Sequence, residues 1–148
     1  KQDKVKVISL ELFDTYGPGD IRKKVVNLAI ESFRNGTEFK MSSGDQEICL
    51  LNVEDVTNAL ITCLNQLPEL EGYNGFTLLN KESTFKLKDL ILEIKEILKS
   101  KSLIKLGHYS YRKNEIFELH SKHSKLSNWN PKTTLSEGII KKVKHENK

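Results

Sequence analysis

The chain has 148 residues, which is enough for one domain with a hydrophobic core of its own. Its hydrophobic fraction of 37% is low and its charged fraction of 30% is high, but regularly spaced apolar residues and the lack of low-complexity tracts favour a globular chain. The net charge of +4 comes from lysines spread from end to end. It predicts a solvated surface and no nucleic-acid partner, and no stretch is apolar enough to span a membrane.

The sequence has two cysteines, Cys49 and Cys63, which lie in apolar segments and form no C-x-x-C pair. This pattern predicts buried, reduced thiols, because disulfides belong to oxidising compartments. No signal peptide is recognisable at the first residues, so we expect a cytoplasmic protein.

Residues 5–20 form an apolar run that breaks sharply into a loop. Residues 5–13 are almost continuously apolar, the pattern of a strand buried on both faces of a mostly parallel sheet. The sequence Asp-Thr-Tyr-Gly-Pro-Gly-Asp follows at residues 14–20 and forces a sharp exit from the carboxyl end of that strand. Ligands of open α/β sheets bind at this edge, so we expect the loop to feed a substrate site.

Two helices and two short strands are predicted next. A helix is expected over residues 22–35, with Asp20 as a possible cap and Asn35-Gly36 as its stop. Strands are expected over residues 37–41 and 47–53, with a turn between them. A second helix begins near Glu54-Asp55 and ends at Pro68. Its predicted buried stripe is Val56, Ala59, Leu60, Cys63, Leu64 and Leu67.

The second half of the chain continues the alternation. It predicts a strand over residues 76–79, a strongly amphipathic helix over residues 87–99 and a strand over residues 103–106. Residues 107–118 are polar and aromatic with little periodicity, which indicates a loop. Thr134 and Glu137 form a capping box for a last helix, whose inner face we expect to hold Ile139, Ile140 and Val143.

This alternation predicts an α/β fold. Only two or three strands are apolar enough for a buried parallel sheet, and the first of them has no element before it. A buried strand needs a neighbour on both sides. We therefore expect the chain to be the back half of a larger fold.

Four short segments stand out in this order along the chain. They are residues 12–19 (Leu-Phe-Asp-Thr-Tyr-Gly-Pro-Gly), 44–46 with 50–56 (Gly-Asp-Gln and Leu-Leu-Asn-Val-Glu-Asp-Val), 111–115 (Tyr-Arg-Lys-Asn-Glu), and 129–131 with 135–139 (Trp-Asn-Pro and Leu-Ser-Glu-Gly-Ile). Together they resemble the C-terminal half of the extended short-chain dehydrogenases/reductases, the NAD-dependent nucleotide-sugar epimerases and dehydratases. The resemblance is closest to the CDP-abequose synthase type, which serves bacterial surface polysaccharides.

The resemblance implies that residues 1–148 are the C-terminal part of a Rossmann-type fold, with the last sheet strands and a small substrate-binding subdomain. The family's Gly-x-x-Gly-x-x-Gly is absent, and its Tyr-x-x-x-Lys is matched only by Tyr109 and Lys113, which lie in a loop far downstream of the expected place. We therefore expect no catalytic residue and no cofactor in this chain alone. The complete enzyme would use NAD or NADP, and we expect it to form a homodimer.

On the side of the first loop, the resemblance implies contacts to a nucleotide-diphosphate sugar from Asp14, Arg22, Lys24 and Val25. Arg22 and Lys24 would add positive charge near the diphosphate, and a solvated helix end is the alternative. Asp14 would bind a sugar hydroxyl or order the loop. Ile48 stands where the family commonly has an arginine aimed at the phosphate, which weakens that site.

On the far side, the resemblance implies a clamp of Tyr111, Arg112 and Glu115. A guanidinium offers a planar fork to phosphate oxygens, and a carboxylate accepts hydrogen bonds from ribose or base. A surface ion pair is the alternative for Arg112 and Glu115. A metal site at His120 and His123 is disfavoured because zinc sites need three or four ligands.

Two functions follow. The first is the substrate-binding half of an NAD(P)-dependent epimerase, dehydratase or reductase acting on a CDP- or dTDP-deoxysugar. The second is a non-catalytic sugar-nucleotide-binding or interaction module. Sequence upstream of the first residue would distinguish them, because the enzyme needs both missing motifs there.

Overall fold

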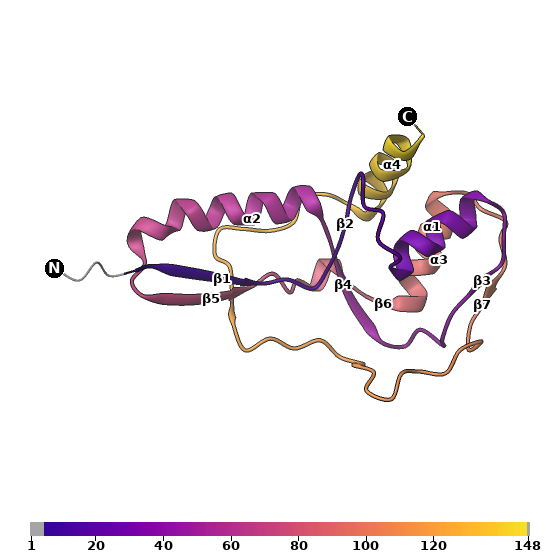
Figure 1. Cartoon of the computed structure of the whole chain (residues 1–148), viewed down its shortest axis with the longest axis horizontal. Helices are drawn as coiled ribbons and strands as arrows, with labels where there is room; N and C mark the ends of the chain where they lie inside the picture. The colour runs from indigo at the N-terminus through magenta and orange to yellow at the C-terminus, as the bar shows by residue number, and fades with distance from the viewer. Residues whose placement is uncertain (1–4, 148) are drawn as a thin grey trace.

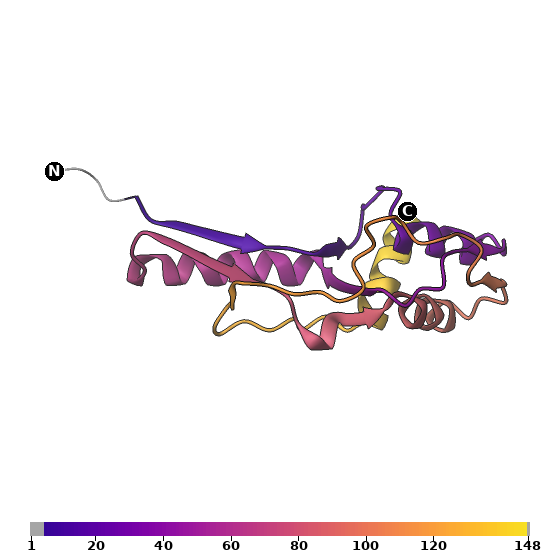
Figure 2. The same cartoon turned by 90° about the horizontal axis from the view of Figure 1, so that it is seen from below.

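The computed structural model describes residues 5–147, and its first strand, β1 (Val7–Glu11), lies at the edge of a parallel sheet (Figure 1). The sheet continues with β5 (Tyr73–Thr77) and then β8 (Ser124–Lys125). Helix α2 (Val53–Gln66) runs along one face of β1 and β5, as Figures 1 and 2 show. A hydrophobic cluster fills the space between this helix and the sheet.

β1 is less buried than its sequence predicts. Ile8 and Leu10 pack into the cluster beneath α2, but Val7 is 42% exposed, and β5 is the one strand that pairs with β1 among residues 5–147. The prediction of burial on both faces is therefore wrong for this chain. A strand's second face is buried only when another layer covers it, and the described residues supply one layer here.

The other end of the molecule holds a second sheet and three helices (Figure 1). β2 (Asp14–Tyr16) pairs in parallel with β4 (Glu47–Asn52), which pairs antiparallel with β6 (Thr84–Lys86). The helices α1 (Val25–Arg34), α3 (Leu87–Ile97) and α4 (Leu135–Glu146) cover a second hydrophobic cluster. A two-residue ladder joins β3 (Phe39–Lys40) to β7 (Ile104–Lys105) at the far end of the molecule (Figure 1).

The helices confirm most of the predicted periodicity. α1 buries one face, with Val26, Ala29, Ile30 and Phe33, and α3 buries Leu87, Leu90, Ile91 and Ile94. The capping box of Thr134 and Glu137 is also present at the start of α4. Two details differ: Ile140 is 40% exposed, and α1 begins three residues later than expected.

The late start of α1 has a local cause. Its N-cap is Lys24 in an extended conformation, with no side-chain cap. Asp20 does not cap the helix, because its carboxylate accepts hydrogen bonds from the backbone and side chain of Arg22 instead. An Asx-type turn at Asp20 thus competes with the helix for the same residues.

The buried face of α2 is narrower than predicted. Asp55, Val56, Ala59 and Cys63 are buried, whereas Leu60 and Leu64 are 52% and 66% exposed. They lie on the side of α2 away from the sheet. In residues 5–147, no element covers that side of the helix, and none of the helices there is long and apolar enough to cross a membrane. Both cysteines are buried and free, as predicted.

Candidate functional site

A groove of about 560 Å³ lies between the start of α1 and the loop of residues 107–118. Its apolar wall comes from α1, β3, β4 and α3, with Val25, Phe39, Met41, Ile48 and Leu87. Five of the seven predicted site residues line it. They are Asp14, Lys24, Val25, Arg112 and Glu115. Residues almost 100 positions apart in the chain thus line one groove.

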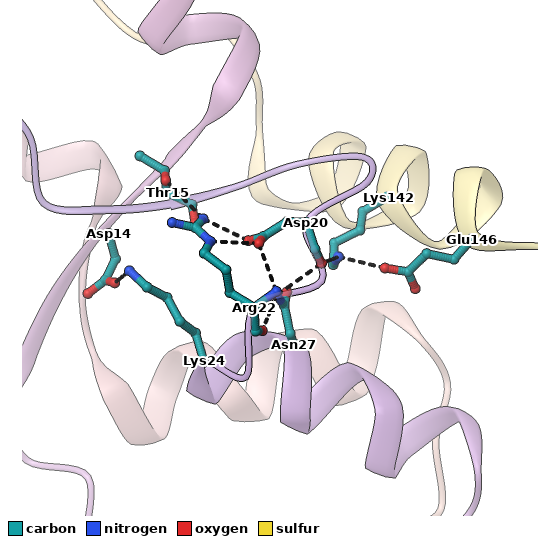
Figure 3. A network of polar contacts seen from close by, with 8 residues as sticks. All are labelled: Asp14, Thr15, Asp20, Arg22, Lys24, Asn27, Lys142 and Glu146. Carbon is teal, nitrogen blue, oxygen red and sulfur yellow. Dashed lines mark hydrogen bonds and ion pairs between the residues drawn. The ribbon is translucent and has the colours of Figure 1, made fainter.

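On one rim of the groove, Lys24 and Asp14 form an ion pair. The ammonium nitrogen of Lys24 lies 2.6 Å from Oδ1 of Asp14, and both side chains are about 40% exposed (Figure 3). Asp14 begins β2 and Lys24 is the N-cap of α1, so the pair joins the two ends of the intervening loop. This geometry favours the loop-ordering role for Asp14, and it leaves Lys24 partly neutralised.

Arg22 does not line this groove. Its Nε lies 2.7 Å from Oδ1 of Asp20, and its Nη2 donates to Oδ2 of Asp20 and to the carbonyl of Thr15 (Figure 3). The guanidinium therefore links Thr15 and Asp20, which flank the Gly-Pro-Gly turn. It also holds the pKa of the Asp20 carboxyl well below its usual range.

This lowered pKa predicts how the loop responds to pH. Because the folded-state pKa of Asp20 lies below the unfolded value, its contribution to stability is present above about pH 4 and is lost as the pH falls further. We expect the difference in melting temperature between the wild type and Asp20→Asn to be largest at pH 7 and to shrink by pH 3. A difference that stays constant from pH 7 to pH 3 would contradict the assignment.

Tyr111 also lies outside the groove. Its hydroxyl donates to Oδ2 of Asp45 at 2.7 Å and accepts from the backbone N–H of Asp45 at 3.0 Å. Its ring packs edge-on against Phe117, and Lys88 donates to the same carboxylate. Tyr111 thus anchors the loop of residues 107–118 to the turn before β4. It positions its neighbour Arg112 and does not itself face the groove.

Arg112 and Glu115 are charged groove residues whose side chains, like that of Lys23, have no partner in the described part of the chain. Within residues 5–147 neither side chain takes part in an ion pair or a hydrogen bond; the backbone N–H of Glu115 donates to the carbonyl of Arg112 at 3.2 Å. They do not form the surface ion pair that was the alternative. A guanidinium and a carboxylate therefore stand at the groove without a partner in the described part of the chain.

Some groove residues have no role in the sequence-based interpretation. Gln46 belongs to the Gly-Asp-Gln segment, and the structure brings it to the groove with its Oε1 buried and unpartnered among the described residues. Tyr109 and Ser110 line the same wall as Arg112. The available signal for Gln46 was its place as a polar residue inside a matched segment. The aromatic loop residues gave none.

A dinucleotide does not fit the described residues. Its pyrophosphate needs a helix that starts directly after a glycine-rich turn. None of the four α-helices in residues 5–147 starts in that way, and Glu54 and Asp55 at the start of α2 would repel a phosphate. No group of three metal-binding side chains is found in the same residues, and His120 lies exposed beside Glu118.

Comparison with known proteins extends this picture. Residues 1–74, half of the chain, match the family described as the NAD dependent epimerase/dehydratase family. The CDP-abequose synthase of Salmonella typhimurium is 26% identical over 145 residues, which are 95% of this chain and 48% of that protein. The chain spans about half the length of the curated relatives it matches.

Solved structures match the fold. The UDP-glucose 4-epimerase of Thermotoga maritima, solved with UDP-glucose, gives a TM-score of 0.75 at 21% identity over 97% of this chain and 46% of that one. MoeE5, solved with UDP-glucose and NAD, gives 0.74 at 17% identity over 96% and 47%. These values confirm the predicted α/β class and its likeness to the C-terminal half of Rossmann-type epimerase structures.

Proposed function

We propose that this chain, which belongs to the NAD dependent epimerase/dehydratase family, is the substrate-binding half of an enzyme that acts on a nucleotide-diphosphate sugar. The observation that carries the proposal is the groove, where Arg112 and Glu115 stand without partners opposite Lys24. The CDP-abequose synthase relatives favour a CDP- or dTDP-deoxysugar and a role in surface polysaccharide synthesis.

Each side of the groove has a chemical task in this proposal. Arg112 binds the diphosphate, because its planar fork matches phosphate oxygens and no described carboxylate competes for it. Glu115 accepts hydrogen bonds from ribose hydroxyls, and Gln46 supplies a buried carbonyl oxygen to a ligand donor. Val25 and Ile48 give the base or sugar an apolar surface. Lys24 is shared between Asp14 and the ligand.

The nicotinamide chemistry belongs, in this proposal, to a second half that is not in this chain. β1 supports it: among the described residues one of its edges is unpaired and Val7 on its open face is exposed, so a further strand and layer fit there. We accordingly assign residues 1–148 to the C-terminal portion of the enzyme, with no catalytic residue of its own.

Arginine 112 gives the most direct test. We expect the purified chain to bind CDP-glucose in isothermal titration calorimetry, and Arg112→Ala to weaken binding about tenfold, because one charge-assisted phosphate contact is lost. Lys113→Ala is the matched control, since Lys113 is exposed and does not line the groove. Its affinity should equal that of the wild type.

The same titration has outcomes that contradict the proposal. Equal losses in Arg112→Ala and Lys113→Ala would indicate a diffuse charge effect in place of a clamp. Wild-type chain that binds neither CDP-glucose, UDP-glucose nor dTDP-glucose would overturn the substrate assignment. Tight NAD binding by this chain alone would overturn the division of tasks between the two halves.

A further inference from the structure

Lys142 on α4 is a fully buried lysine outside the groove. It is 1% exposed, and its ammonium donates to the backbone carbonyl of Asp20 at 2.8 Å and to Glu146 at 2.6 Å (Figure 3). Burying an ammonium costs several kcal/mol before its contacts are counted, and such pairs are weak evidence for stability. The loop that Lys142 contacts is therefore a better guide to its role than its contribution to folding stability.

The loop that Lys142 reaches has few backbone hydrogen bonds of its own. Between residues 17 and 24 these are Asp20 N–H to the carbonyl of Gly17, at a long 3.3 Å, and Lys24 N–H to that of Arg22. Side chains supply the rest: Arg22 bonds Asp20, and Asn27 donates to the carbonyls of Asp20 and Arg22. A loop held mainly by side chains keeps its shape only while those contacts persist.

Lys142 brings to this loop a contact from a separate element. Asp20, Arg22 and Asn27 all belong to the loop or to α1, whereas Lys142 lies 122 positions away from Asp20 on α4. Glu146, its other partner, pairs in turn with Arg34 of α1 at 2.9 Å. Figure 3 shows Lys142 reaching from α4 towards Asp20, with Arg22 and Asn27 lying between it and the Asp14–Lys24 pair.

We propose that Lys142 is a positioning residue for the groove: from α4 it fixes the carbonyl of Asp20, and through the loop it holds the Lys24–Asp14 pair at the rim. The proposal rests on the proposed function for the identity of the ligand. Helix α4 contributes no residue to the groove. In this proposal it nevertheless controls the position of Lys24, the cation at the start of α1.

Lys142→Met separates this role from packing. Methionine fills the volume of the lysine stem, so packing around the stem is kept, while the Asp20 carbonyl and Glu146 lose the ammonium donor. Lys141→Met is the matched control, because Lys141 is exposed, pairs with Glu54 and makes no contact with the loop. Lys142→Arg retains a buried cation and serves as the conservative variant.

Hydrogen exchange followed by mass spectrometry, on the full chain, tests the loop directly. In Lys142→Met we expect exchange in residues 17–24 to rise about tenfold while that in α3 stays unchanged. The affinity for CDP-glucose should fall about tenfold in the same variant. Lys141→Met should change neither quantity, and Lys142→Arg should restore part of both.

Hydrogen exchange and ligand affinity can each contradict a different part of the proposal. Unchanged exchange in residues 17–24 would overturn the positioning role. An equal rise of exchange in α3 would also overturn it, because such a rise indicates global destabilisation. A loosened loop with unchanged affinity would overturn the link to the groove. If the wild type binds no sugar nucleotide, the proposed function fails, while the exchange data still decide whether Lys142 holds the loop.

Discussion

Replacing Asp55 by alanine is expected to lower the free energy of unfolding by about 3 kcal/mol. Asp55 is 2% exposed at the start of α2. Its two carboxylate oxygens accept from the backbone N–H groups of Lys132 at 2.9 Å and Thr133 at 3.1 Å, and its own carbonyl accepts from the indole of Trp129 at 3.0 Å. Alanine would leave two backbone donors without acceptors.

The effect should extend beyond α2. The contacts of Asp55 hold residues 129–133, which lead directly into α4, so the docking of α4 depends on this carboxylate. For a chain of this length, about 3 kcal/mol corresponds to a fall in melting temperature of roughly 10 °C. Thermal denaturation followed by circular dichroism measures it.

Glu54→Gln is the matched control for Asp55. Glu54 lies in the same first turn and has the same relation to the helix dipole, but it is about half exposed and pairs with Lys141. A surface pair of this kind contributes less than about 1 kcal/mol. Equal melting temperatures for Asp55→Ala and Glu54→Gln would show that the buried contacts are not responsible.

The helices were predictable because apolar residues recur at a regular spacing along the whole inner face of each helix. Leu87, Leu90, Ile91 and Ile94 recur at three- and four-residue steps, and α3 forms as expected. Three of the short strands were not predicted, although β3 and β7 fall within the strands expected at residues 37–41 and 103–106. β2, β6 and β8 have two or three residues each, too few for a period, and they exist because a partner strand lies beside them.

Burial was predictable only where the covering layer is in the same chain. Leu60 and Leu64 carry the apolar period of a buried face but remain exposed, as does Val7 of β1. Periodicity reports which faces are apolar, and it cannot report whether the layer that covers them is present. In the proposed enzyme, the open edge and face of β1 would meet the dinucleotide-binding half.

The predicted site residues also fall into two groups. One groove is lined by Asp14, Arg112 and Glu115, which lie in segments that resemble the family, and by Lys24 and Val25, which lie outside those segments. Arg22 and Tyr111 instead bond to Asp20 and Asp45. A sequence gives the charge and reach of a side chain, but several partners lie within that reach. Asp20 stands only two residues from Arg22, and this proximity was the signal available for Arg22.

A second large effect is expected at Gly138, in the first turns of α4. Glycine costs about 1 kcal/mol relative to alanine in a helix interior, so Gly138→Ala would be stabilising if space allowed. A Cβ there would lie inside the van der Waals contact distance of the Tyr16 hydroxyl, and 2.8 Å from Nδ2 of Asn52. Tyr16 and Asn52 are 3% and 2% exposed, so neither side chain can move into solvent.

The steric clash is expected to cost more free energy than the better helix propensity of alanine gains. Overpacking in a filled core costs about 1–3 kcal/mol, and here the new methyl group meets two buried side chains at once. We expect Gly138→Ala to lower the free energy of unfolding by about 2 kcal/mol, measured by urea denaturation. Ser136→Ala, on the exposed side of the same turn, should change it by only a few tenths.

A double-mutant cycle identifies the clashing group. Tyr16→Phe removes the hydroxyl that the Cβ would meet first, so the double variant Tyr16→Phe/Gly138→Ala should be less destabilised than the two single changes predict together. Strict additivity would assign the clash to Asn52 instead. Because Lys142 lies one turn beyond Gly138 on α4, an outward shift of this helix should also weaken its contact with Asp20. Gly138→Ala should therefore raise hydrogen exchange in residues 17–24, whereas Ser136→Ala should leave it unchanged.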